Sequence, residues 1–155
     1  MNPLNSPLEV GVRALVLLAE TYPKGLDLAQ LVVLDHAMLH SGDLHGPDSL
    51  HPDMPAQPGA LGMKRRLLEE ALVVLVRAGL AGVSATREGI EYHATEQGPG
   101  FVDILEAPYV EQLRERAEWA VHHYAPAGSD IRTATREITV SRPGEHRQNQ
   151  ETGRA

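Results

Sequence analysis

The chain has 155 residues, a hydrophobic fraction of 42%, and only one Trp, one Phe and four Tyr. This length is enough for one domain with one core, and the scarcity of aromatic residues favours a helical core of Leu, Val and Ala over a β-sandwich. The absence of cysteine excludes disulfides and thiolate metal sites, and no signal-like segment opens the chain, so we expect a cytoplasmic protein. The longest apolar runs, such as ALVLLA and ALVVLV, are too short to cross a bilayer, which excludes an integral membrane protein.

The net charge of −7 is unevenly distributed. Residues 1–124 carry 9 Lys and Arg against 17 Asp and Glu, whereas residues 125–155 carry 5 against 4. An acidic body repels a phosphate backbone, so nonspecific DNA binding is disfavoured unless a local basic patch overcomes it.

Two capped helices are predicted in the first 40 residues. Ser6 as N-cap, Pro7 at the first helical position and Glu9 as the partner in a capping box predict a helix over about 7–21. Asp27, followed three residues later by Gln30, caps a second helix that ends near His40.

Residues 43–59 are rich in Pro and Gly and show no apolar period, so we expect a long loop. A third helix follows over about 60–78, with Gly79 as its stop. Its buried side is predicted to consist of Leu61, Leu68, Leu72 and Leu75.

A β-hairpin is predicted after this helix. Leu80 leads into a short strand, Arg87-Glu88-Gly89 supplies the turn, and Ile90, Tyr92 and Ala94 alternate as a half-buried return strand. The fold class is therefore mainly α with a small β-hairpin, in the order of a winged helix-turn-helix. An α+β domain with the same elements arranged differently is the alternative.

The remaining chain is predicted to form two helices and a tail. Phe101, Val102, Ile104 and Leu105 form a short helical turn, and PYVEQLRERAEWAVHHYA forms a final helix that packs on the domain or serves a partner. We expect residues 1–124 to be a winged-helix-like domain with a C-terminal helical extension and residues 125–155 to be a disordered tail, within which TREITV is a candidate strand for a partner's edge.

Four histidines and four aspartates fall within LDHAMLHSGDLHGPDSLHPD. His36 and His40 share one helical face, with Asp43 and His51 nearby, and imidazole and carboxylate are zinc ligands. No H-E-x-x-H or other metal motif completes a site, so we favour histidines that cap the end of a helix and aspartates that fix loop turns. We therefore predict no metal site, and treat His36, His40, Asp43 and His51 as a candidate interaction loop.

Lys64, Arg65 and Arg66 open the helix that would enter the major groove in a winged helix-turn-helix. They are candidate DNA or partner contacts. The competing interpretation is a solvated helix face in which they pair with Glu69 and Glu70 at helical spacing. The sequence contains no phosphate-binding loop, no dinucleotide fingerprint and no nucleophile elbow, so an enzyme is not expected and no catalytic residue is assigned.

Several short phrases resemble one bacterial family. They are the Asn-Ser-Pro-Leu-Glu opening, Leu-Asp-His followed by His-Ser-Gly-Asp, and Ser-Leu-His-Pro, together with LGMKRRLLEEAL and the stretch from EYHATEQG to EWAV. Over roughly residues 2–124 the chain resembles the middle component of ABC three-component systems, which are small proteins encoded between an SMC-like ABC ATPase and an effector in anti-phage and anti-plasmid loci. The resemblance implies a non-enzymatic adaptor that binds the ATPase and the effector, with DNA met through the complex and no cofactor. A winged-helix transcription regulator is the alternative.

Overall fold

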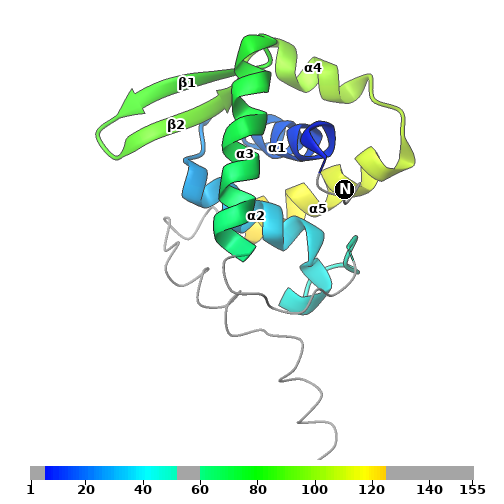
Figure 1. Cartoon of the computed structure of the whole chain (residues 1–155). Coiled ribbons are helices and arrows are strands. Elements are labelled where there is room, and N and C mark those ends of the chain that lie inside the picture. The colour runs from blue at the N-terminus through cyan, green and yellow to red at the C-terminus, as the bar shows by residue number, and fades with distance from the viewer. Residues whose placement is uncertain (1–5, 52–59, 125–155) are drawn as a thin grey trace, which may run out of the picture.

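The computed structural model describes residues 6–51 and 60–124, and these form five α-helices, one 3₁₀ helix and one antiparallel hairpin (Figure 1). The mainly helical class, the hairpin and the element order predicted from the sequence are confirmed for these residues. In chain order the elements are α1 (Pro7–Thr21), α2 (Leu28–Leu39), η2 (Ser41–Leu44), α3 (Ala60–Arg77), β1 (Ala81–Thr86), β2 (Gly89–Ala94), α4 (Gln97–Asp103) and α5 (Pro108–Tyr124).

The helix ends follow the local sequence. The side chain of Ser6 accepts a hydrogen bond from the Glu9 N–H, but the Glu9 carboxylate lies 3.9 Å from Arg13, and the predicted capping box is formed only by its Ser6 half. Asp27 and Gln30 form a reciprocal capping box with bonds of 2.7 and 2.9 Å. After α3, Gly79 adopts a φ of 75°, which lets the last carbonyls of the helix accept bonds from the residues that follow.

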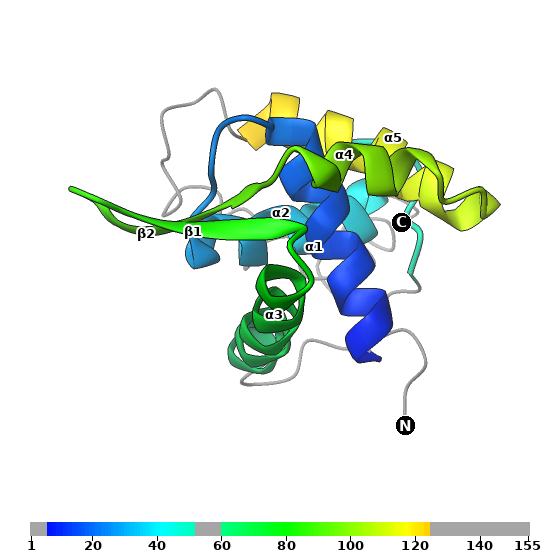
Figure 2. The same ribbon diagram turned by 90° about the horizontal axis from the view of Figure 1, so that it is seen from above.

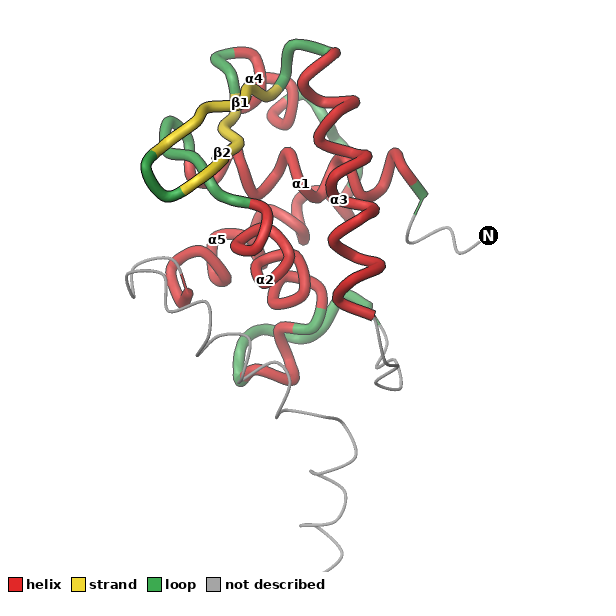
Figure 3. Tube along the Cα trace, turned by 60° about the vertical axis from the view of Figure 1, so that its left-hand side comes forward, coloured by secondary structure: helices red, strands yellow, loops and turns green. Residues whose placement is uncertain are grey.

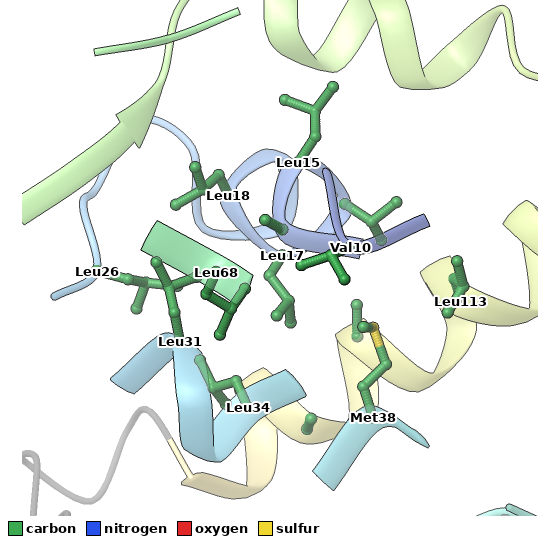
Figure 4. Close-up of a cluster of buried hydrophobic side chains, with 14 of the residues drawn as sticks. Val10, Leu15, Leu17, Leu18, Leu26, Leu31, Leu34, Met38, Leu68 and Leu113 are labelled. Carbon is green, nitrogen blue, oxygen red and sulfur yellow. The ribbon is translucent and has the colours of Figure 1, made fainter. Parts of the chain in front are cut away.

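α1 is the central element of the body. Figure 2 shows α1 with α3 on one side and α4 and α5 on the other. Leucines from several helices meet around α1, and burial of one such side chain contributes about 1.5–3 kcal/mol. The cluster drawn in Figure 4 includes Val10, Leu15, Leu17, Leu18, Leu26, Leu31, Leu34, Met38, Leu68 and Leu113.

The hairpin extends sideways from this body (Figures 1 and 3). Ala81 pairs with Ala94 at its base and Thr86 with Gly89 at its tip. Ile90 is 58% exposed rather than half-buried as its alternation predicted, because the tip projects beyond the helices. Leu26, between α1 and α2, forms an isolated antiparallel bridge with Tyr92 on the other edge of β2.

The segment predicted as a loop over residues 43–59 begins within the 3₁₀ helix η2. η2 continues the helical path beyond α2, and His45 then adopts a left-handed φ of 63°, uncommon for a residue with a side chain. Residues 52–59 and the predicted tail 125–155 lie outside the described residues. Within residues 6–51 and 60–124, no helix has the length and apolarity to cross a membrane.

Candidate functional site: a polar junction of four helices

A completely buried carboxylate links three helices. Asp35 of α2 is 0% exposed, and its Oδ1 accepts a hydrogen bond of 2.8 Å from Nε of Arg13 on α1, itself 1% exposed. Its Oδ2 accepts a bond of 2.7 Å from Nζ of Lys64 on α3. Paired charge-assisted bonds of this length are strong inside a protein, so Asp35 fixes α1, α2 and α3 relative to one another.

The charge state of Asp35 follows from its partners. Burial alone would raise the pKa of this carboxyl, but the charges of Lys64 and Arg13 and their hydrogen bonds lower the pKa to about 2. Asp35 is therefore ionised at neutral pH.

A second set of contacts holds the segment after η2 against α5. Nε2 of His51 lies 2.8 Å from the Tyr109 hydroxyl, and the backbone N–H of His51 donates to the Leu39 carbonyl. Arg116 of α5 donates two bonds to the Asp48 carbonyl, at 3.1 and 3.2 Å. Residues 45–51 are therefore attached to α5 by polar contacts.

The titrating groups near this attachment are held neutral. Burial, with the nearby Arg13 charge, lowers the pKa of His51 to about 4. Burial, with His40 and Lys64, lowers the pKa of His36 to about 3. Burial and the nearby Glu9 carboxylate raise the pKa of Tyr109.

We call this region the polar junction. Its members are Glu9, Arg13, Asp35, His36, His40, His51, Lys64 and Tyr109.

The structure brings together the three histidines of the predicted interaction loop. The ring centroids of His36 and His40 are 4.7 Å apart, and those of His40 and His51 are 6.3 Å apart. Asp43 lies on η2, where its N–H donates to the His40 carbonyl. Among the residues that the structure describes, no group of three or more His, Cys, Asp or Glu is arranged to hold a metal ion.

The three basic residues at the start of α3 do not form one patch. Lys64 points inward to Asp35, Arg65 lies 3.8 Å from Glu69 on the same helix, and Arg66 is exposed. The pairing of Arg65 with Glu69 agrees with the predicted solvated face, whereas the Lys64 contact was not foreseen.

The outward face of α3 was also not predicted from the sequence. It presents Met63, Arg66, Glu70, Val73, Val74 and Arg77, all exposed. Val74 is 59% exposed although it sits in the most apolar run of the helix, because Leu68, Leu72 and Leu75 occupy the buried side. The signal for this face was the position of Val73 and Val74 outside the helical period of those leucines.

The sequence of the chain matches components of ABC-three component (ABC-3C) systems. The model of the family ABC-3C system Middle Component 2 matches residues 3–139, so the chain belongs to this family. The family resemblance found in the sequence is confirmed, and the match extends beyond residue 124, where that resemblance ended. No curated protein and no solved structure matches the chain.

Proposed function

We propose that the chain is a non-enzymatic adaptor that binds the SMC-like ABC ATPase of its system and couples the ATPase to the effector. Membership of the Middle Component 2 family is the observation that carries this proposal. The polar junction supports it, because Asp35 is ionised and bound to two cations while His36 is neutral and partly buried. These groups hold helices together, a scaffolding role.

The finer fold that we propose is a winged helix-turn-helix, with α2 and α3 as its two principal helices and β1–β2 as its wing. The order of helices and hairpin supports this assignment. So does the isolated bridge between Leu26 and Tyr92, which pairs the segment between α1 and α2 with the hairpin at one residue.

The outward face of α3 favours a protein partner over DNA. Met63, Val73 and Val74 are large apolar side chains exposed on one helix, and such patches mark protein interfaces. Glu69 and Glu70 lie on the same helix, where carboxylates would repel phosphates. In this proposal the chain reaches DNA only as part of the complex with the ATPase.

The candidate interaction loop has a supporting role in the proposal. His36, His40 and His51 lie at the polar junction, and His51 contacts Tyr109 of α5. In this proposal these residues, together with Asp43 of η2, hold residues 41–51 in place. Residues 41–51 then form a second contact with the partner, beside the outward face of α3.

Co-expression with the ATPase of the same locus tests the proposal. The tagged chain is expected to retain the ATPase through affinity purification and gel filtration. Replacement of Val73 and Val74 by Glu should weaken this binding at least about 30-fold, the effect of losing an interface hot spot of about 2 kcal/mol. The matched control is Ile104→Glu, an exposed apolar residue after α4. Failure of two folded proteins to co-purify contradicts the adaptor function.

A transcription regulator is the second candidate, and exposure of Arg65 and Arg66 is the observation in its favour. This candidate expects salt-sensitive binding of the isolated chain to its own promoter, weakened by Arg65→Ala with Arg66→Ala. The adaptor proposal expects no such binding at physiological salt.

A further inference from the structure

The outer edge of β1 carries backbone groups that point away from β2. Tyr92 exchanges both backbone hydrogen bonds with Leu26, on the side of β2 opposite β1. Tyr92 and its β1 partner Val83 therefore form a non-hydrogen-bonded pair, and the pattern alternates along the strand. The N–H and C=O groups of Ala81, Val83 and Ala85 consequently face outward.

This edge lacks the devices that usually protect a strand. β1 reads AGVSAT, with no charged residue and no proline, and no other described segment pairs with it. Val83 is 51% exposed, and Ala85 and Ile90 are exposed on the same face of the hairpin. Such an edge can bind an added strand. Main-chain hydrogen bonds supply the affinity, and every second side chain of the added strand determines the specificity.

Residues 131–140 of this chain, IRTATREITV, have the composition of such a strand. Six of these ten residues are β-branched, the type enriched in strands. The family match continues through most of this segment, to residue 139, beyond the end of α5 at Tyr124.

Length and charge also suit the pairing. α5 runs toward the side of the molecule from which the hairpin projects (Figures 1 and 2). The seven residues from Tyr124 to Ile131 reach up to about 25 Å. Segment 131–140 has two arginines and one glutamate, whereas the hairpin has Arg87 against Glu88 and Glu91, so their net charges are opposite.

We propose that residues 131–140 dock as a strand on the outer edge of β1 within the same molecule. The docked segment bonds the outward groups of Val83 and Ala85 and prevents the edge from pairing with other copies. This inference does not depend on the adaptor function.

Residue-resolved hydrogen exchange by NMR on the full chain tests the proposal. The outward amides of Val83 and Ala85 should exchange at least about tenfold more slowly than unprotected amides. Thr135→Pro with Ile138→Pro removes amides from the docking strand and should abolish this protection. The inward amides of Gly82 and Ser84, which bond to β2, should stay protected and report an intact hairpin. Gln148→Pro with Gln150→Pro, outside the segment, is the matched control and should change nothing.

Two exchange results overturn the proposal. They are unprotected Val83 and Ala85 amides in the unaltered chain, and protection that survives the prolines at 135 and 138. A nitroxide at Thr133→Cys distinguishes the molecule's own segment from that of a second copy, because the chain has no other cysteine. The proposal expects broadening of the Val83 signal that persists when labelled chains are diluted with unlabelled ones. If the Val83 signal broadens only when the nitroxide and the isotope label are on different chains, docking within one molecule is contradicted.

Discussion

The apolar cluster around α1 and the polar junction hold the same helices together, the cluster by apolar packing and the junction by ion pairs and hydrogen bonds. In the cluster, Leu17 and Leu31 pack with many neighbours, and loss of one side chain leaves the remaining contacts in place. In the junction, Asp35 balances the buried Arg13, and removal of Asp35 leaves Arg13 with the longer contact of 3.9 Å to the Glu9 carboxylate. Stability should therefore fall gradually with damage to the cluster and abruptly with damage to the junction.

The largest effect is expected at Asp35. Asp35→Leu removes the 2.8 Å partner of the buried Arg13 and leaves it the 3.9 Å contact to Glu9, which should lower the free energy of unfolding by about 3–5 kcal/mol, measured by urea denaturation. The combination Arg13→Met, Asp35→Leu and Lys64→Met removes every charge of the ion-paired triad and should recover most of this loss. A combined variant as unstable as the single one would contradict the comparison.

A core leucine should show a smaller effect of a different kind. Leu72→Ala, at a fully buried position on α3, should cost about 3 kcal/mol through lost burial and a residual cavity. This cost should be the same at pH 7 and pH 5, since no ionisable group is involved. A strongly pH-dependent cost would show that the cluster and the junction are coupled.

Acid should weaken the junction in two steps. The pKa values of His36 and His51 are lowered to about 3 and about 4, so the unfolded chain binds protons first as pH falls below 6.5. Their contribution is complete above pH 6.5 and is lost as pH falls toward 4 and then 3. The pKa of Asp35 is lowered from 3.8 to about 2. The contribution of Asp35 to stability is therefore complete above about pH 3.8 and is lost as the pH falls toward 2.

The melting temperature should therefore fall steadily between pH 7 and pH 4. His36→Gln should flatten this slope, whereas His122→Gln, on the exposed side of α5, serves as the control. If the melting temperature falls with pH equally steeply in the unaltered chain and in His36→Gln, His36 is not held neutral in the folded protein.

The smallest effect concerns the attachment of residues 45–51 to α5. A Cβ at Gly46 would overlap the Trp119 ring, so Gly46→Ala should displace the segment and cost about 1–2 kcal/mol. Trp119 is the only tryptophan, so its fluorescence reports this displacement directly. The matched control is Gly11→Ala in α1, where a Cβ meets nothing within 4 Å and better helix propensity should stabilise the chain by about 0.5–1 kcal/mol. An unchanged Trp119 spectrum in Gly46→Ala would contradict the contact.

The sequence predicted the helices and hairpin well because their signals are local. Ser6, Asp27 and Gly79 mark helix ends through bonds to residues a few positions away, and the two strands flank a short turn at Arg87 and Glu88. The polar junction was harder to predict because its contacts cross long stretches of chain. Arg13 and Lys64 reach Asp35 across 22 and 29 residues, and His51 reaches Tyr109 across 58. A charged residue within the apolar run LVVLDHAML was the available signal, since a buried Asp requires partners.

Binding between the purified chain and the purified ATPase of the same locus tests the central claim most directly. Titration calorimetry with both proteins folded should give a saturable complex with a dissociation constant of about 1 μM or lower, equivalent to about −8 kcal/mol. The apolar residues on α3 predict that binding survives 0.5 M salt. Absence of binding, with ATP and with DNA present as well as without them, would contradict the adaptor function.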